Sequence, residues 1–359
     1  MNYPNFKVCC RCFTFNQSMY ITDTMYGFIM QQTSFPFVCT IVDDASTDGE
    51  QEVIRKYVDE NFDFSEGSVA FNKETDYAFI TFAQHKTNKN CYFAVLYLKE
   101  NHYSKGMGKQ KMSYLTEWRD MCEYEALCEG DDYWIDEMKL LKQVDVMDSN
   151  KECSICVGIT ETINREGQPS GKFMPSKSYS GLFDLEKFCN QQFRLGQWFG
   201  HTSSFFFRRE TMRELEKFRN KVFVNFPYGD IVVMLGCLLL GYGYMIDDVL
   251  SRYRINSGGF NSSLLADVDK AIRVERKLIK GMEDFDVYTE KKYHKYIANR
   301  ILWSKCIIDY YASGRNGLVY LRPKYWKIAK TQGLRTTFIM AIKSIAPVPY
   351  NAIKKILKH

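Results

Sequence analysis

Residues 37–49 read FVCTIVDDASTDG, and this stretch decides the fold class that the sequence predicts. Its first six residues are almost all apolar, which is typical of a strand buried on both faces of a parallel sheet. The pair Asp43-Asp44 follows at once, and a segment of helical spacing then begins at the capping residue Asp48. A strand, an acidic turn and a helix in this order predict one unit of an α/β fold.

The same alternation continues on both sides of this unit. We expect further strands at residues 6–13, 92–98, 124–128, 154–163 and 203–207. We expect helices at residues 17–32, 48–58, 109–121, 136–148 and 228–240. Residues 62–90 show no clear period and predict an irregular insertion. The sequence therefore predicts a mostly parallel sheet flanked by helices in residues 1–265, followed by a helical region in residues 266–359.

A second acidic pair, Asp131-Asp132, follows the strand expected at residues 124–128 after Glu129 and Gly130. In an open parallel sheet, ligands bind at the carboxyl ends of the strands, so this pair and Asp43-Asp44 are expected at one edge. Carboxylates at such an edge can hold a divalent cation that neutralises a diphosphate. The alternative is that each Asp simply caps the helix that follows it.

The charge of the chain is distributed unevenly. The whole sequence carries 48 Lys and Arg against 43 Asp and Glu, but residues 291–359 hold 15 of the basic residues and one acidic residue, Asp309. The final segment, residues 338–359, mixes aliphatic residues with lysine and contains two prolines, which predicts a helix on a membrane surface. We therefore expect an anionic membrane as a partner, and not nucleic acid, because no nucleic-acid-binding module is present.

The twelve cysteines lie largely in apolar runs, where free cysteine behaves as a small buried hydrophobe. Cys153 and Cys156 form a C-x-x-C, but the chain has only five histidines that could help to complete a zinc site, so zinc is not expected. The N-terminal residues show no basic region followed by an apolar core, so no signal peptide is expected. We expect a cytoplasmic protein, peripheral at the inner face of the cell membrane.

Other ligand-binding motifs fail on their spacing. The run from Asp44 to Gly49 resembles the start of a calcium loop, but Arg55 stands where the closing Glu belongs. Residues 106–109 lack the spacing of a phosphate-binding P-loop, and no G-x-G-x-x-G follows the first strand. A nicotinamide cofactor is therefore not expected.

Three motifs carry a likeness to a known family: FTFN at residues 13–16, IVDDASTDG at residues 41–49 and CEGDDYW at residues 128–134. In this order and spacing, the chain resembles a family 2 glycosyltransferase with the GT-A fold, of the kind that builds bacterial surface polysaccharides. The likeness covers roughly residues 5–260 and includes Asp230 and the pair Tyr253-Arg254. It implies transfer of a sugar, with inversion, from a nucleotide-sugar to a hydroxyl of a glycan or lipid-linked acceptor. A UDP-sugar is the expected donor.

The resemblance also implies a nucleotide pocket. Phe13 and Phe15 fall where the first loop of the family lines the base pocket. Asp43 and Asp44 fall in the second loop, where Asp44 would hydrogen-bond the base, and Asp131 would bind the ribose.

The remaining roles concern the reaction itself. The resemblance implies that Asp132 ligates Mg²⁺ or Mn²⁺ on the diphosphate and that Asp230 is the catalytic base, with a plain helix cap as the other interpretation of Asp230. Trp134 and His201 are expected on the acceptor side, although a tryptophan there is as often core packing. The family often has a metal-approaching histidine shortly after Tyr-Arg, where this chain has Asn256.

Two alternatives stay open. A sugar nucleotidyltransferase has a similar fold, but it usually carries a Gly-rich loop with a basic residue where this chain has residues 13–17, FTFNQ. A non-catalytic nucleotide-sugar or glycan-binding module would bind the donor without transfer. The presence of Asp44, Asp131, Asp132 and Asp230 argues against such a decayed site.

Overall fold

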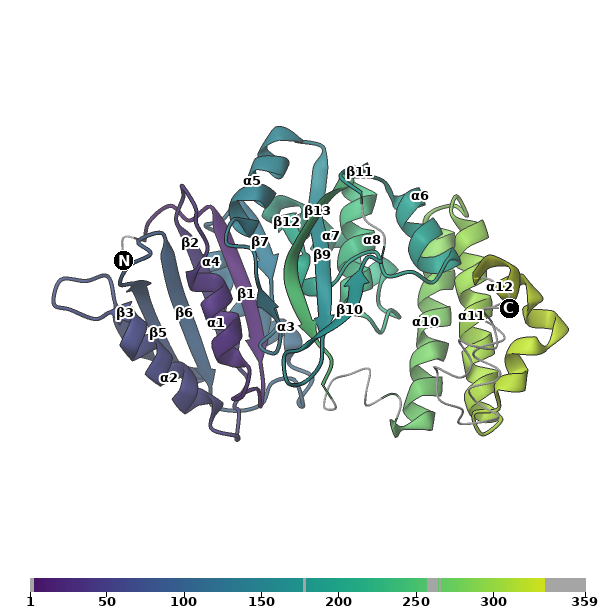
Figure 1. Ribbon diagram of the computed structural model, residues 1–359, viewed down its shortest axis with the longest axis horizontal. Coiled ribbons are helices and arrows are strands. Elements are labelled where there is room, and N and C mark those ends of the chain that lie inside the picture. The colour runs from purple at the N-terminus through teal and green to yellow at the C-terminus, as the bar shows by residue number, and fades with distance from the viewer. Residues whose placement is uncertain (1–2, 177–178, 257–263, 265, 333–359) are drawn as a thin grey trace. The chain divides into compact units, whose positions relative to one another are not determined.

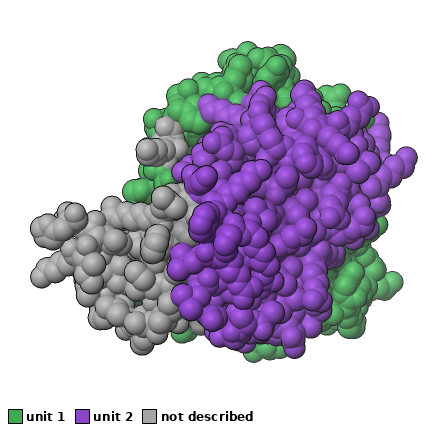
Figure 2. Space-filling view, turned by 90° about the vertical axis from the view of Figure 1, so that its right-hand side faces the viewer, with its two compact units in different colours: residues 1–183, 200–215, 236–255 green, residues 184–199, 216–235, 256–359 purple. Residues whose placement is uncertain are grey.

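The computed structural model describes residues 3–176, 179–256, 264 and 266–332 (Figure 1). The chain divides into two compact units (Figure 2). The first unit comprises residues 1–183, 200–215 and 236–255, and the second comprises residues 184–199, 216–235 and 256–359. The described residues contain one sheet of thirteen strands, and this sheet lies in the first unit.

Four parallel strands form the centre of this sheet. Their order in space is β7 (Tyr124–Leu127), β1 (Val8–Thr14), β2 (Phe37–Asp43) and β6 (Cys91–Leu98). Helix α1 (Ile21–Ile29) connects β1 to β2, and α2 (Glu50–Asn61) follows β2. These two helices contact each other and lie over one face of the sheet (Figure 1).

The burial of strand β2 explains why its residues form a nearly continuous apolar run. Cys39 and Ile41 belong to the core cluster that includes α1, whereas Val38 and Val42 belong to a second cluster that includes Trp118. Both faces of β2 are therefore covered, and all seven of its residues are buried. The predicted α/β fold is confirmed.

Residues 62–90 differ from the prediction of an irregular insertion. They contain β3 (Phe62–Asp63), β4 (Phe71–Glu74) and β5 (Ala78–His85), and β5 pairs antiparallel with β6. Because β5 is buried along most of its length, it lacks the alternation that marks a half-buried antiparallel strand. The helix expected at residues 109–121 is divided into α3 (Gly108–Ser113) and α4 (Thr116–Arg119).

The rest of the sheet brings distant segments together. Strand β9 (Cys153–Ile163) pairs parallel with β13 (Tyr242–Arg254), and β12 (Phe206–Arg208) lies between β7 and β9. The short strand β8 (Tyr133–Trp134) pairs with β13 immediately after the second acidic pair. The remaining elements of this part are β10 (Pro169–Met174), β11 (Gly181–Phe183), α5 (Lys139–Ser149), α7 (Arg209–Val222) and α8 (Gly229–Leu240).

The second unit is helical where it is described. It contains α6 (Leu185–Phe188), a π-helical turn (Cys189–Arg194), α10 (Val268–Tyr288), α11 (His294–Ala312) and α12 (Trp326–Gln332). Within the described ranges, no helix has the length and apolar character that crossing a membrane requires. The surface helix expected at residues 338–359 lies outside the described residues, so its contact with an anionic membrane stays a prediction.

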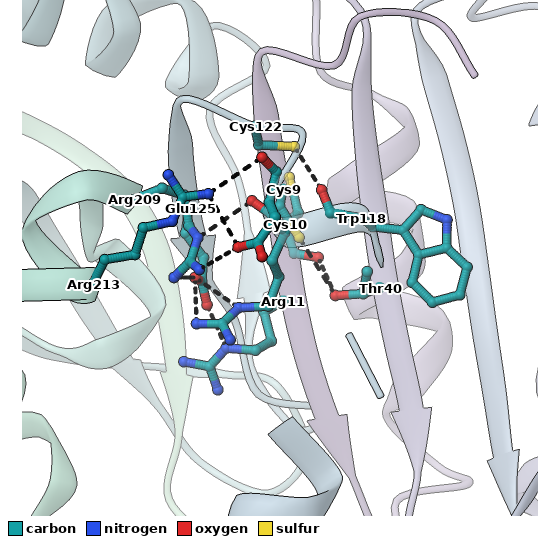
Figure 3. Close-up of polar contacts among 11 residues, drawn as sticks. Cys9, Cys10, Arg11, Thr40, Trp118, Cys122, Glu125, Arg209 and Arg213 are labelled. Carbon is teal, nitrogen blue, oxygen red and sulfur yellow. Dashed lines mark hydrogen bonds and ion pairs between the residues drawn. The ribbon is translucent and has the colours of Figure 1, made fainter. Parts of the chain in front are cut away.

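A cluster of charges is buried among the central strands (Figure 3). Glu125 of β7 is fully buried and forms ion pairs with Arg11 at 2.6 Å, with Arg119 at 2.9 Å and with Arg209 at 3.4 Å. Burial alone would raise the pKa of the Glu125 carboxyl, but the three guanidinium groups outweigh it and hold the pKa below its usual range. The cluster therefore joins β1, β7 and the start of α7 through one carboxylate.

We expect Glu125→Gln to lower the free energy of unfolding by about 3–5 kcal/mol at pH 7, because the arginines lose their buried counter-charge. A lowered folded-state pKa means that the carboxylate stabilises the fold above its ordinary pKa. This contribution is lost as the pH falls through the lowered folded-state pKa, so the difference in stability between wild type and variant should narrow at acidic pH. Urea unfolding at several pH values measures this difference in the free energy of unfolding. Glu66→Gln, in an exposed loop, is the control. A difference that does not change with pH would contradict this account.

Candidate functional site

Three loops meet at the carboxyl edge of the central strands, one after each of β1, β2 and β7. Backbone hydrogen bonds join them: the N–H of Asp44 donates to the carbonyl of Thr14 at 3.0 Å, and the N–H of Gly130 donates to the carbonyl of Phe13 at 3.1 Å. A Cβ atom on Gly130 would overlap the Thr14 hydroxyl, so only glycine allows this approach. The structure therefore brings both predicted acidic pairs to one edge of the sheet.

Glu50, the first residue of α2, ties the first two loops together. Its buried carboxylate accepts hydrogen bonds from the Thr14 hydroxyl, from the Gln17 N–H at 2.8 Å and from the Ser46 hydroxyl at 2.8 Å. Burial raises the pKa of Glu50, against the effect of these hydrogen bonds. No pattern in the sequence marked Glu50 as part of the site, because a glutamate in the first turn of a helix is common.

Asp44 is buried, and three groups hold its carboxylate. Oδ1 accepts from the backbone N–H of His102 at 2.8 Å, and Oδ2 accepts from the backbone N–H of Tyr103 at 3.0 Å. Oδ2 also forms a 2.9 Å ion pair with Lys111 of α3. The ammonium group of Lys111 lies 4.6 Å from the ring centroid of Phe13, so this lysine links the first two loops of the site.

Asp43 ends β2, and one of its carboxylate oxygens is satisfied. Oδ1 accepts from the Ser46 N–H at 3.1 Å and from the Gln51 side chain at 2.6 Å, while Oδ2 is buried without a hydrogen-bond partner. Burial raises the pKa of Asp43. Phe15, in contrast, is 42% exposed in the first loop, so its ring is accessible at the edge of the sheet.

Glu129, Asp131 and Asp132 form an acidic cluster in the loop after β7. One carboxylate oxygen of each residue lies within 4.8 Å of the others. Negative charges this close repel one another unless a cation lies among them. Hard carboxylate oxygens are the ligands that Mg²⁺ and Mn²⁺ prefer.

Asp132 is the most buried member of this cluster, with 1% of its surface exposed. Its Oδ1 accepts from the backbone N–H of Arg254 at 3.0 Å, while Oδ2 is buried without a hydrogen-bond partner. Burial, and then the charges of Asp131 and Glu129, raise the pKa of Asp132 well above its ordinary value. An unpartnered buried carboxylate oxygen beside two other carboxylates fits the divalent cation predicted from the sequence.

Arg254, the last residue of β13, holds this loop in place. Its guanidinium donates to the backbone carbonyls of Asp131 and Arg165, each at 3.1 Å, and forms a 2.8 Å ion pair with Asp23. In the sequence, Arg254 stood out only as part of the family likeness. Its contact with Asp132 joins residues 122 positions apart, for which a single sequence carries no local signal.

His201 lies next to Asp132. Its Nδ1 atom is 3.5 Å from Asp132 Oδ2, accepts the Ser203 N–H at 3.3 Å, and belongs to a ring that stacks on Tyr253 with 4.1 Å between centroids. Burial lowers the pKa of His201 to about 3, so the imidazole is neutral at pH 7. The structure thus brings a residue expected on the acceptor side to the predicted metal ligand.

Trp134, the other residue expected on the acceptor side, lies in the core and is 1% exposed. Its ring packs against Phe28 with 4.8 Å between centroids, and its Nε1–H donates to the carbonyl of Ser203 at 2.8 Å. The ammonium group of Lys139 lies 3.9 Å from the ring centroid. These contacts favour core packing, the second of the two interpretations that the sequence left open.

Asp230 lies in the first turn of α8 and belongs to the second unit. It is half-buried, and its Oδ1 accepts the N–H of Ile231 at 2.8 Å. Burial raises the pKa of Asp230 above its ordinary value, although this hydrogen bond acts in the opposite direction. A raised pKa is the direction that suits a carboxylate acting as a general base.

No protein-family profile matches the chain. Two uncharacterised proteins, Rv1520 of Mycobacterium tuberculosis and Mb1547 of Mycobacterium bovis, are each 30% identical to it over 162 residues. The match covers 45% of this chain and 37% of each relative, so the chain corresponds to well under half the length of those proteins.

A solved structure shares the fold. The residue 1–349 fragment of Staphylococcus aureus TarS, in complex with UDP-GlcNAc, matches with a TM-score of 0.50 and 14% identity, and the match covers 96% of this chain and 93% of that one. At this identity the likeness concerns the fold alone. The chain therefore has a GT-A-like fold, with helices in its C-terminal part.

Proposed function

We propose that the chain is a metal-dependent, inverting glycosyltransferase of family 2. It would transfer a sugar from a UDP-sugar to a hydroxyl of a glycan or lipid-linked acceptor in surface polysaccharide synthesis. The observation that carries this proposal is the acidic cluster at the carboxyl edge of the parallel strands, in which a buried oxygen of Asp132 has no partner. The GT-A fold supports it, and the complex of TarS with UDP-GlcNAc is the reason for choosing uridine as the first base to test.

The first two loops would hold the nucleoside. In this proposal Phe13 and Phe15 line the pocket of the base. Asp43 and Asp44 belong to the second loop of that pocket, and Asp131 contacts the ribose. The hydrogen bonds that hold Asp44 and the loop at residues 101–103 together keep this part of the site in place before the donor arrives. Such preorganisation lowers the entropic cost of binding.

The reaction would be a single displacement at the anomeric carbon. Asp230 accepts the proton of the acceptor hydroxyl while that oxygen forms a bond to the anomeric carbon. The bond from this carbon to the diphosphate breaks on the opposite face and its electron pair leaves with the diphosphate, so the configuration inverts. Asp132 would hold Mg²⁺ or Mn²⁺, which supplies positive charge against the departing diphosphate.

A thermal-shift panel of UDP, GDP, ADP and CDP, each with and without Mn²⁺, tests the donor site. We expect UDP with Mn²⁺ to raise the melting temperature by about 5 °C, and either component alone to raise it much less, because a saturating ligand that binds only the native state stabilises it by about 2–3 kcal/mol. A larger rise with another diphosphate would keep the site and change the base. No rise with any nucleotide would contradict the proposed function.

A non-catalytic module of the same fold is the competing function. It predicts the same thermal shift, but no release of UDP from a UDP-sugar when acceptors are supplied. The test is therefore completed with nucleotide-sugars of the base whose diphosphate gives the largest shift. The release of that nucleoside diphosphate is measured in the presence of acceptors.

A further inference from the structure

A cavity of about 550 Å³ is lined by the loop after β2, the first turns of α2, the start of β5 and the end of β6. This volume falls in the range of small-ligand sites, about 300–1,000 Å³. None of the residues assigned above to the nucleotide, the metal or the reaction lines the cavity, so the proposed function leaves it unexplained. Its polar lining includes Ser46, Thr47, Glu52, Arg55, Tyr97 and Lys99.

Arg55 presents an oriented cation to this cavity. Its guanidinium carbon lies 3.8 Å from the ring centroid of Tyr97 and 4.9 Å from that of Phe79, so two aromatic rings hold the side chain in place. Among the residues that the structure describes, Arg55 has no ion pair and no side-chain hydrogen bond. Stacking occupies the face of a guanidinium group and leaves the N–H groups at its edge available to oxygen atoms.

Tyr97 adds a buried donor to the same cavity. The residue is 3% exposed, and its hydroxyl makes no hydrogen bond within the described part of the chain. Burial raises the pKa of Tyr97, so the hydroxyl keeps its proton and can donate it. A buried hydroxyl without a partner is costly. Because Tyr97 lines the cavity, an oxygen atom of a ligand bound there would remove that cost.

The charges of the lining favour an anion. Two basic residues, Arg55 and Lys99, stand against one acidic residue, Glu52. Lys99 pairs with Glu74 at 2.8 Å, which leaves N–H groups of its ammonium for a ligand. Guanidinium groups match the oxygens of phosphate and of carboxylate. Phosphate fits better here, because Arg55, Tyr97 and Lys99 together offer donors for more than the two oxygens of a carboxylate.

A purely structural role of Arg55 is the competing explanation. In that case its guanidinium would only cover the rings of Phe79 and Tyr97, and no anion would bind. The carboxylates of Asp43 and Asp59 also act on Tyr97, but neither residue lines the cavity. Packing by Arg55 does not account for the unpartnered hydroxyl of Tyr97, whereas an anion in the cavity accounts for both side chains.

We propose that this cavity binds a phosphate group through Arg55, Tyr97 and Lys99. The inference goes beyond the proposed function and does not rest on it. Free phosphate and a phosphorylated sugar are two sources of the same chemical group, and the experiment distinguishes them.

Isothermal titration calorimetry tests the site on the full chain, freed of divalent cations on a chelating resin and kept at low salt to limit screening. We expect inorganic phosphate to bind with a dissociation constant of about 1 mM, which is attainable for so small a ligand. Glucose should not bind. Tighter binding of glucose 1-phosphate than of phosphate would support a phosphorylated sugar as the ligand, and equal binding would support free phosphate. Binding of neither, or equal binding of glucose, would overturn the proposal and leave the proposed function standing.

Two variants locate the binding. Tyr97→Phe removes only the unpartnered hydroxyl, so the protein should keep its stability while its affinity for phosphate falls about tenfold. Arg55→Gln should lower the affinity by more than that, because it removes the charge and the fork of N–H groups. Tyr242→Phe, at an exposed tyrosine of β13, is the control and should bind phosphate as the wild type does. Unchanged phosphate affinity in either folded variant would overturn the proposal.

Discussion

Asp132→Asn should abolish the Mn²⁺-dependent effect of UDP on the melting temperature and lower the rate of sugar transfer by at least about 10³-fold, which corresponds to about 4 kcal/mol of transition-state stabilisation. An amide retains the shape of the carboxylate but lacks the charge that holds a divalent cation. The metal-free protein should not lose stability, because Asp132 is buried beside two other carboxylates and its raised pKa indicates that the fold disfavours the charge. This combination of lost function with unreduced stability marks a residue kept for binding.

The control for this experiment is the same substitution at an exposed site. Asp145 lies on the exposed face of α5, and Asp145→Asn should leave both the thermal shift and the transfer rate unchanged. The measurements are the melting temperature with Mn²⁺ and UDP and the initial rate of UDP release. Full Mn²⁺-dependent activity in Asp132→Asn would show that the cation binds elsewhere.

Asp230→Asn should lower the rate constant for transfer by about 10²–10⁴-fold while the affinity for the donor stays within about twofold of wild type, because a general base acts on the acceptor hydroxyl and not on the nucleotide. The pH profile gives a second test. Only the deprotonated carboxylate accepts a proton, so wild-type activity should fall as the pH drops through the pKa of Asp230, which burial raises above that of an ordinary aspartate. The residual activity of the variant should lack this decline.

Asp269 offers a matched control for this second variant, because it lies in the first turn of α10 as Asp230 lies in the first turn of α8. Asp269→Asn removes the same favourable charge from a helix N-terminus and should change stability slightly and transfer not at all. A loss of donor affinity in Asp230→Asn equal to its loss of activity would assign Asp230 a structural or donor-binding role instead.

The sequence by itself was sufficient to predict the central parallel strands and the helices between them. Strands buried on both faces give continuous apolar runs, such as residues 37–42, and the helices between them keep a helical spacing. The acidic pair at residues 43–44 lies at the end of one of these strands and the pair at residues 131–132 lies in the loop after another, and parallel strands present their carboxyl ends at one edge. Both pairs were therefore predicted at the candidate site from local patterns alone.

The tertiary structure decided the surroundings of those carboxylates. The pairing of β8 with β13 brings Arg254 to one oxygen of Asp132, and the chain before β12 brings His201 to the other oxygen of the same carboxylate. The same pairing places Trp134 in the core, where a local motif equally allowed an exposed position. Each of these contacts joins residues tens of positions apart or more, so it depends on strand register and on how the loops are closed. Local propensity and periodicity predict neither the strand register nor the loop conformation. They indicate only which face of its own helix or strand a residue occupies.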